Sequence, residues 1–121
     1  MKKILIIEDD RFLLDLLSKK LTTAGYKVTG VGDGEAGLDA VAKESPDLVL
    51  LDLMLPILDG FEFLRRIRKD DKTAKLAVIV ISNLGGAEDI AKAKGLGVME
   101  YLVKANFTTD EILTKVKNAL A

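Results

Sequence analysis

Five short apolar runs alternate along this chain with longer stretches in which apolar residues recur at helical spacing. The apolar runs occupy residues 4–7, 26–31, 48–51, 76–81 and 98–103, and the helical stretches occupy residues 12–24, 36–41, 60–69, 87–94 and 108–120. Strict alternation of this kind predicts a parallel sheet with helices on both faces and right-handed crossover connections. We therefore expect an α/β fold with a doubly wound, five-stranded parallel sheet of the flavodoxin-like type, built from five strand–helix units in the strand order 2-1-3-4-5.

The length of the chain limits the number of domains. Its 121 residues suffice for one domain of common size, and the last helical stretch leaves no residues for a second. We expect a single domain over residues 1–121, without an output domain. No apolar run approaches the length of a membrane-spanning helix, and the short apolar run near the N-terminus is too short for a signal peptide, so we expect a cytoplasmic protein.

Charge and composition exclude several classes of function. With 18 basic and 19 acidic residues the net charge is −1, which gives no electrostatic reason to bind nucleic acid or an anionic membrane. The sequence contains no cysteine and no histidine, so thiolate nucleophiles, zinc–thiolate sites and histidine bases are excluded. Any metal would be bound by oxygen atoms, which favours a hard cation such as Mg²⁺.

Polar residues follow four of the expected strands at their carboxyl ends. They are Glu8, Asp9 and Asp10 after the first strand, Asp52 after the third, Ser82 after the fourth and Lys104 after the fifth. Ligands bind at this edge of open α/β sheets, so we expect these side chains to converge. Taken singly, each has a plain structural explanation, with Asp10 as a helix N-cap, Asp52 and Ser82 as turn residues and Lys104 as a solvated charge.

Taken together, these residues suit phosphoryl chemistry. Neighbouring carboxylates repel each other, and Mg²⁺ relieves the repulsion while binding one or two of them. A carboxylate such as Asp52 can also attack phosphorus and form an aspartyl phosphate. The transferred phosphoryl group then needs positive charge and hydrogen-bond donors at its oxygens, which Mg²⁺, Lys104 and Ser82 can supply.

The same residues resemble a known family. In order and separation, the chain resembles the receiver domain of bacterial two-component response regulators, of the stand-alone CheY-like type, at residues 4–10, 52–56, 59–60, 80–82 and 101–104. The resemblance implies that Asp52 is the phosphoacceptor and that Asp9 is a direct Mg²⁺ ligand. It also implies the backbone carbonyl of Met54 as a further ligand and Glu8 as an acidic neighbour acting through water.

The resemblance further implies how such a site would signal. Ser82 would be the switch hydroxyl, Tyr101 the aromatic residue whose rotamer follows it, and Lys104 the partner first of Asp52 and then of its phosphate. The phosphoryl group would come from a sensor histidine kinase or a phosphotransfer protein. The surface formed by the last two helices and the last strand would then change for an unknown downstream protein. The chain would be a signalling switch rather than an enzyme with a separate substrate, and either a monomer or a phosphorylation-dependent dimer.

Several positions depart from the family pattern. Ala105 follows Lys104 where the family usually has a proline joined by a cis bond. A cis bond without proline costs about 2.5–4 kcal/mol, so either that bond is retained or the loop takes another path. Asn83 occupies a position where a smaller alanine is usual. Met54 and Leu84 flank the site with apolar bulk, and we expect them to hinder an attacking water and to prolong the phosphorylated state.

Three other functions are compatible with parts of the sequence. Residues Gly32–Gly37 fit the pattern G-x-G-x-x-G, and Asp52 lies 20 residues beyond the first glycine, as in dinucleotide-binding domains. Against this, the motif follows the second strand, and Asp33 and Glu35 would face a pyrophosphate. A phosphohydrolase of the haloacid dehalogenase type is the second alternative. Such an enzyme needs an acid two residues after its nucleophile, and this acid is missing because Met54 occupies that position. A phosphate-independent docking module of the receiver fold is the third alternative.

Overall fold

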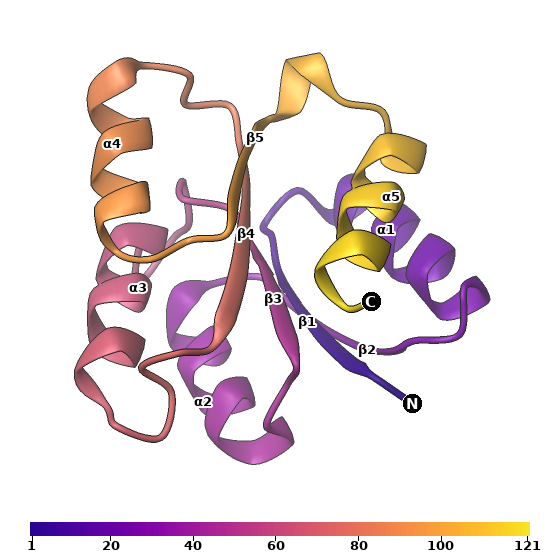
Figure 1. Ribbon diagram of the computed structural model, residues 1–121, viewed down its shortest axis with the longest axis horizontal. Coiled ribbons are helices and arrows are strands. Elements are labelled where there is room, and N and C mark those ends of the chain that lie inside the picture. Colours follow the sequence, from indigo (N-terminus) through magenta and orange to yellow (C-terminus); the bar gives the residue numbers. More distant parts are fainter.

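The computed structural model describes residues 1–121 and contains five strands and five α-helices in strict alternation (Figure 1). In chain order they are β1 (Lys3–Ile7), α1 (Arg11–Thr23), β2 (Lys27–Val31), α2 (Gly34–Glu44), β3 (Leu48–Leu51), α3 (Gly60–Lys69), β4 (Ala77–Ser82), α4 (Ala87–Gly95), β5 (Glu100–Val103) and α5 (Thr109–Ala119), with a 3-10 turn at Lys104–Asn106. The strands form one parallel sheet in the order β2-β1-β3-β4-β5. The predicted fold class and strand order are therefore confirmed.

The predicted bounds of these elements differ from the observed ones by a few residues at the element ends. β2 begins at Lys27 rather than at Tyr26, because the Tyr26 N–H donates to the Leu21 carbonyl and closes the end of α1. α2 extends to Glu44, because the helix continues until Ser45 adopts a left-handed conformation with a φ of 47°. Neither difference moves a residue of the predicted site.

Side-chain caps fix the beginnings of four helices. Asp10, Asp33, Asp59 and Thr108 each accept a hydrogen bond from a backbone N–H in the first turn of α1, α2, α3 and α5. Such caps satisfy otherwise unpaired donors and are typically worth about 1 kcal/mol each. α4 is the exception, because its N-cap is Gly86 and no side chain caps it. Asp10 thus has the N-cap role that the sequence allowed for it.

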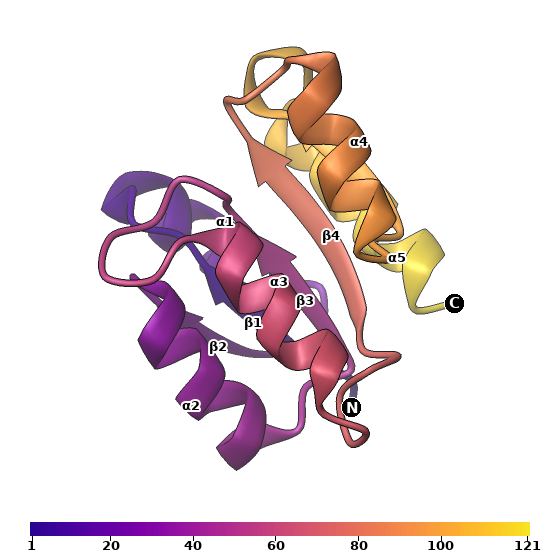
Figure 2. The same ribbon diagram turned by 90° about the vertical axis from the view of Figure 1, so that its left-hand side faces the viewer.

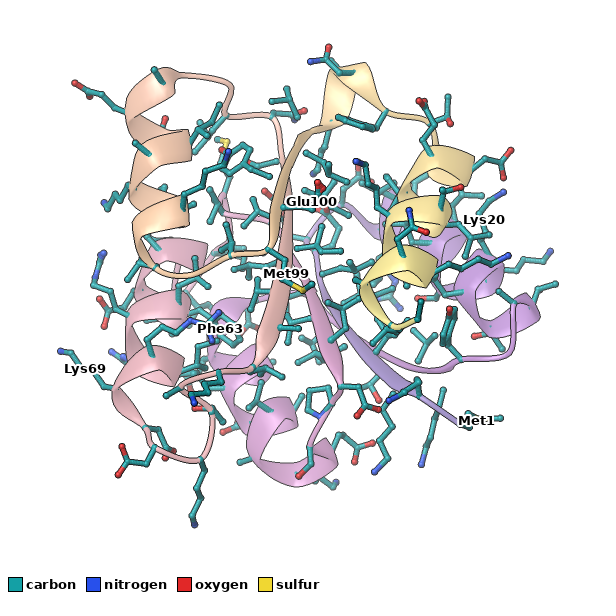
Figure 3. The ribbon with its side chains drawn as sticks, in the orientation of Figure 1. Met1, Lys20, Phe63, Lys69, Met99 and Glu100 are labelled. Carbon is teal, nitrogen blue, oxygen red and sulfur yellow. The ribbon has the colours of Figure 1, made fainter.

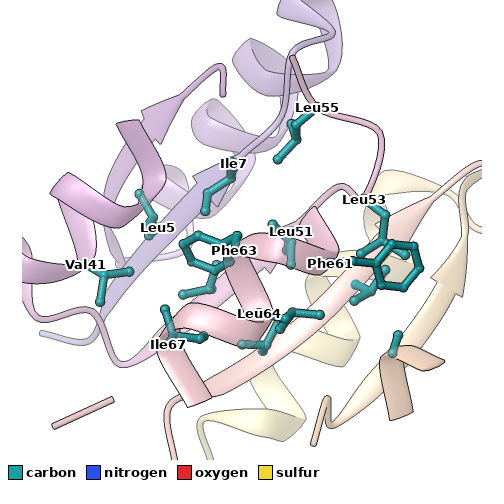
Figure 4. Packing of buried hydrophobic residues seen from close by; sticks show 14 of the residues in the cluster. Leu5, Ile7, Val41, Leu51, Leu53, Leu55, Phe61, Phe63, Leu64 and Ile67 are labelled. Atoms are coloured by element: carbon teal, nitrogen blue, oxygen red, sulfur yellow. The ribbon is translucent and has the colours of Figure 1, made fainter. Parts of the chain in front are cut away.

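The sheet separates two hydrophobic cores (Figures 1 and 2). On one face α2, α3 and α4 pack over a cluster with Phe63 near its centre, which Figure 4 shows between Leu5 and Leu51. On the other face α1 and α5 pack over a second cluster. Successive strand residues point to opposite faces of the sheet, and helices cover both faces. For this reason alternate residues of β1 and β3 belong to the two clusters, and both strands are apolar on both sides. On α3, Phe63 points inward whereas Lys69 points to solvent (Figure 3).

The longest helix, α1, has 13 residues, and none of the helices could cross a bilayer.

Candidate functional site

The carboxyl ends of β1 and β3 bring the side chains of Glu8 and Asp52 together. Ile7 pairs with Leu51 in the register of the two strands, so the next residues along these strands are also neighbours. The ladder continues by one bond, in which the Asp52 N–H donates to the Ile7 carbonyl at 3.0 Å. Both acidic residues are buried, with exposed fractions of 3% for Glu8 and 5% for Asp52. Two buried carboxylates in contact require a cation, a proton or hydrogen-bond donors.

Lys104 is a cation shared by both carboxylates. Its Nζ lies 2.8 Å from Oε1 of Glu8 and 3.0 Å from Oδ2 of Asp52. The chain has no cis peptide bond, so the Lys104–Ala105 bond is trans, and the chain turns through one 3-10 turn instead. Of the two options that the missing proline left open, the loop thus takes another path and still delivers the lysine to Asp52. The contact with Glu8 was not predicted from the sequence.

Burial and hydrogen bonding shift the pKa values of Glu8 and Lys104. Burial is the main cause that raises the pKa of Glu8 from 4.5 to about 7, against the opposing hydrogen bonds from Lys104 and from the Asp10 N–H. Burial alone would lower the pKa of Lys104, but its hydrogen bonds to Glu8 and Asp52 outweigh this effect and raise it. Lys104 therefore stays charged at neutral pH, where Glu8 is close to its titration midpoint.

Three carboxylates form an acidic cluster with the spacing of a metal site. Oxygen atoms of Glu8, Asp9 and Asp52 all lie within 4.8 Å of one another, and Asp9 is exposed to solvent. Asp10 caps α1 and does not belong to the cluster. With Lys104 as the adjacent cation, up to three negative charges face one positive charge. A donor set made only of oxygen atoms with excess negative charge fits a hard divalent cation such as Mg²⁺.

Ser82 and Tyr101 hold the loop that follows β4. Ser82 is fully buried, and its Oγ accepts a hydrogen bond from the Leu84 N–H at 3.2 Å. The Tyr101 hydroxyl donates to the Leu84 carbonyl at 2.5 Å, and burial raises the pKa of this hydroxyl. Neither side chain is hydrogen-bonded to Asp52 or Lys104. Their predicted roles at the phosphate therefore stay predictions. What the structure shows is that Ser82 and Tyr101 both hydrogen-bond the backbone of Leu84, one at its N–H and the other at its carbonyl.

The loop after Asp52 combines a fixed backbone with exposed apolar side chains. The Met54 N–H donates to Oδ1 of Asp52 at 3.2 Å, while the Met54 side chain is 55% exposed. Further along, Ile57 has a φ of 70°, and the Leu58 N–H donates to the Pro56 carbonyl at 2.7 Å. This is a γ-turn of the rare, strained kind. Sequence patterns did not signal it, because a β-branched residue rarely adopts a positive φ.

Two of the three glycines in residues 32–37, Gly34 and Gly37, serve close packing. A Cβ on Gly34 would lie 2.0 Å from the Leu58 carbonyl oxygen, and a Cβ on Gly37 would lie 2.5 Å from a side-chain atom of β1. Asp33 occupies the N-terminus of α2 by accepting the Ala36 N–H at 2.7 Å. The helix N-terminus that would bind a pyrophosphate is therefore covered by its own cap and by the loop between β3 and α3. This packing argues against the dinucleotide-binding alternative.

Comparison with known sequences agrees with this geometry. The model of the response regulator receiver domain family matches residues 4–117. The chain is 40% identical over 120 residues to the DNA-binding dual master transcriptional regulator RpaA of Synechocystis sp. (strain ATCC 27184 / PCC 6803 / Kazusa), a match that covers 99% of this chain and 49% of RpaA. It is 37% identical over 119 residues to sporulation initiation phosphotransferase F of Bacillus subtilis (strain 168), covering 98% of this chain and 94% of that protein. This chain spans about half the length of RpaA, so the absence of an output domain stays a prediction.

A solved structure gives the same fold. The Mn(2+)-bound form of response regulator Rcp1 matches with a TM-score of 0.82 and 28% sequence identity, over 94% of this chain and 88% of that one. The sequence matches and the structural match therefore agree on the fold of this chain. In this chain the carboxylates lie at the ends of β1 and β3, and the lysine follows β5. The chain belongs to the response regulator receiver domain family.

Proposed function

We propose that this chain is a phosphorylation switch that accepts a phosphoryl group on Asp52 from a sensor histidine kinase or a phosphotransfer protein. Phosphoacceptance is the function of the family, whose members are signalling switches that interact with such donors. For this chain the supporting observation is the buried Asp52 carboxylate, which shares the Lys104 ammonium with Glu8. A turn or cap residue needs no buried lysine, so this contact favours the phosphoacceptor role over the structural one.

In the proposed reaction a carboxylate oxygen of Asp52 forms a bond to phosphorus while the phosphorus–nitrogen bond of the donor phosphohistidine breaks. The bonding electron pair stays with the donor imidazole, which takes up a proton from solvent, and Asp52 becomes an acyl phosphate. Lys104 already lies 3.0 Å from Oδ2 of Asp52, so it would pair with the new phosphoryl oxygens after a short movement.

The same part of the chain would hold Mg²⁺. Asp9 and Asp52 would bind it through carboxylate oxygens and Met54 through its backbone carbonyl, while Glu8 would act through water. The support for this assignment is the cluster of three carboxylates within 4.8 Å and the Mn(2+)-bound form of the relative Rcp1. When bound, Mg²⁺ would offset negative charge on the transferred phosphoryl oxygens.

Ser82 and Tyr101 would transmit the phosphorylation to the surface formed by α4, β5 and α5. The Ser82 hydroxyl now bonds the Leu84 N–H, and it would turn toward a phosphoryl oxygen. Tyr101 would then leave the Leu84 carbonyl and turn inward into the space that Ser82 vacates. The phosphate would thus bias a two-state equilibrium, and a downstream protein would recognise the changed surface.

Incubation with acetyl phosphate and Mg²⁺, followed by intact mass measurement, tests the proposal. We expect a phosphoryl adduct on the wild type, no adduct on Asp52→Asn and an unchanged adduct on the control Asp59→Asn. Asp59 caps α3 by accepting the Glu62 N–H at 2.9 Å, a role that asparagine fills equally well. An undiminished adduct on Asp52→Asn would contradict the proposal. Absence of an adduct on the wild type would contradict it too, and would favour the phosphate-independent docking module.

A further inference from the structure

Arg68, in the last turn of α3, binds backbone carbonyls from two separate loops. Its Nε and Nη2 donate to Leu96 and Gly97 at 2.7 and 3.3 Å, and its Nη1 donates to Thr73, Ala74 and Leu76 at 3.3, 3.2 and 2.8 Å. None of the ion pairs of the chain includes Arg68, so its guanidinium serves carbonyl oxygens alone. Burial lowers its pKa, although arginine stays protonated in proteins.

Two of these carbonyls belong to the C-terminal end of α4. Leu96 is the C-cap of this helix, and Gly97 follows it with a φ of 79°. The last carbonyls of a helix have no partner within the helix and lie at the negative end of its dipole, so a cation there is stabilising. Arg68 therefore ties the end of α4 both to α3 and to the loop before β4.

The N-terminal end of α4 lacks comparable ties. Gly86 provides no side-chain cap, and the one buried residue of the helix, Ala93, lies in its second half. The other tether, Lys92 with its Nζ 4.3 Å from the centre of the Phe61 ring, also comes from the second half. α4 packs against β5, and the short loop after Ser82, the last residue of β4, joins the untied end of α4 to the proposed site (Figure 2).

From this asymmetry we infer that Arg68 is a positioning residue, which fixes the C-terminal end of α4 as a pivot about which the N-terminal end moves. A small displacement of the loop after Ser82 then tilts α4 instead of shifting the whole helix. The pivot itself is a property of the unmodified chain. Its use in signalling rests on the proposed phosphoacceptor function, so the two are tested separately.

Amide hydrogen exchange in the unmodified chain tests the pivot. In the wild type, the Ile90 N–H, bonded to the Gly86 carbonyl at 3.1 Å, should exchange faster than the N–H groups of Leu96 and Gly97, which are bonded at 3.0 Å. In Arg68→Met, exchange at Leu96 and Gly97 should become at least about tenfold faster, the effect expected for losing one hydrogen bond to a charged group.

Two further variants make this test specific. Arg66 lies two residues earlier on α3 and forms an exposed pair with Glu62 at 3.0 Å, so Arg66→Met should leave exchange at Leu96 and Gly97 unchanged. Arg68→Lys keeps the charge but lacks the five-donor fork that reaches both loops, and it serves if the methionine variant fails to fold. Uniform exchange along α4 in the wild type would overturn the pivot. The pivot would also be overturned if, in both Arg68 variants, the exchange rates at Leu96 and Gly97 rose no more than those of the other amides of α4.

Backbone amide chemical shifts of the phosphorylated chain test how the pivot is used. In the wild type, shift changes should be largest at Gly85 and Gly86 and smallest at Leu96 and Gly97, whereas in Arg68→Lys they should extend along the whole helix. Intact mass of the same samples separates the two possible failures. A missing phosphoryl adduct would contradict the proposed function. The pivot would then be tested by hydrogen exchange in the unmodified chain alone. An adduct with changes as large at Leu96 as at Gly86 would contradict the pivot.

Discussion

Nζ of Lys104 lies 3.0 Å from Oδ2 of Asp52, although alanine and not proline follows the lysine and the bond between Lys104 and Ala105 is trans. The 3-10 turn at Lys104–Asn106 brings the lysine there, and the same ammonium lies 2.8 Å from Glu8. The two buried carboxylates of Glu8 and Asp52 therefore share one cation, so that three charged groups are in contact. Substituting any of these three residues changes the electrostatic environment of the other two. The effect can be measured on metal affinity and on the pH dependence of stability.

Replacement of Lys104 should strengthen metal binding. Lys104→Met removes a positive charge that competes with a divalent cation for Glu8 and Asp52, so we expect Mg²⁺ affinity to rise by roughly tenfold, as measured by calorimetric titration. Lys115→Met is the matched control, because Lys115 pairs with Glu100 at 3.3 Å, outside the acidic cluster, and its loss should leave the affinity unchanged. An unchanged or weaker affinity in Lys104→Met would place the metal elsewhere.

The raised pKa of Glu8 should make the metal-free chain less stable as the pH rises. Between its ordinary pKa of 4.5 and its folded pKa of about 7, the folded state keeps a proton that the unfolded state has released. The free energy of unfolding therefore falls as the pH rises through this window, by on the order of 2 kcal/mol, and Glu8 causes no further change above it. Urea unfolding in a chelating buffer at several pH values measures this.

A pair of variants isolates the contribution of Glu8 from those of other groups. Glu8→Gln should flatten the dependence between the two pKa values, whereas Glu35→Gln, on the exposed side of α2, should retain it. A slope in Glu8→Gln as steep as that of the wild type would show that another group causes it.

Relief of the strained γ-turn should stabilise the fold. Ile57 has a φ of 70° and is 76% exposed, so Ile57→Gly removes backbone strain and loses little burial. We expect the free energy of unfolding to increase by about 1 kcal/mol. Ile57→Ala is the control, since it removes most of the side chain but keeps the Cβ that disfavours this conformation. Equal stability of the glycine and alanine variants would show that the turn stores no strain.

The close approach at Gly34 should make that position intolerant of a methyl group. A Cβ there would lie 2.0 Å from the Leu58 carbonyl oxygen, so Gly34→Ala should lower the free energy of unfolding by about 2 kcal/mol or more. Gly95→Ala is the matched control, because nothing lies within 4 Å of the added Cβ, and alanine favours a helix over glycine. Thermal unfolding compares the two. A Gly34→Ala variant as stable as the control would contradict the packing described for α2.

Apolar side chains beside Asp52 should prolong the phosphorylated state. Met54 is 55% exposed next to Asp52, and Leu84 is partly buried beside the loop that Ser82 holds. Met54→Asn and Leu84→Asn would admit and orient water, so the phosphoryl adduct should decay several times faster when followed by mass measurement. Met99→Asn, at an exposed position before β5, should decay like the wild type. Unchanged decay in both site variants would refute this hypothesis.

Local sequence signals account for most of what could be predicted. Each strand is a short apolar run, each helix has a spaced apolar face, and parallel strands place their terminal residues at one edge, so the parallel sheet and the nearness of Asp52, Asp9 and Lys104 followed. The strand order was predicted as the common order of such sheets. The start of α5 is likewise a local signal, because Thr108 and Glu111, which form a capping box there, lie only three residues apart in the sequence.

The features that escaped prediction depend on three-dimensional paths or on strain. The contact of Lys104 with Glu8 requires the 3-10 turn at Lys104–Asn106. The sequence did not determine the path of this loop, because alanine stands where proline is usual. The positive φ of Ile57 contradicts its conformational preference. The five carbonyls around Arg68 come from loops that periodicity does not describe. The ligand and switch roles of Met54, Ser82 and Tyr101 stay predictions.

The two hydrophobic clusters on opposite faces of the sheet share no residue. Substitutions that are distant and have no common partner usually change stability additively. Residues on the inward faces of α1 and α5 therefore need no compensating change on the inward faces of α2, α3 and α4, whereas neighbouring strand residues such as Ile4 and Leu5 belong to different clusters but share the backbone. Within this family, such a division would let the two helical layers diverge at different rates, because a sequence change tolerated in the helices on one side of the sheet does not restrict the changes that the helices on the other side can accept.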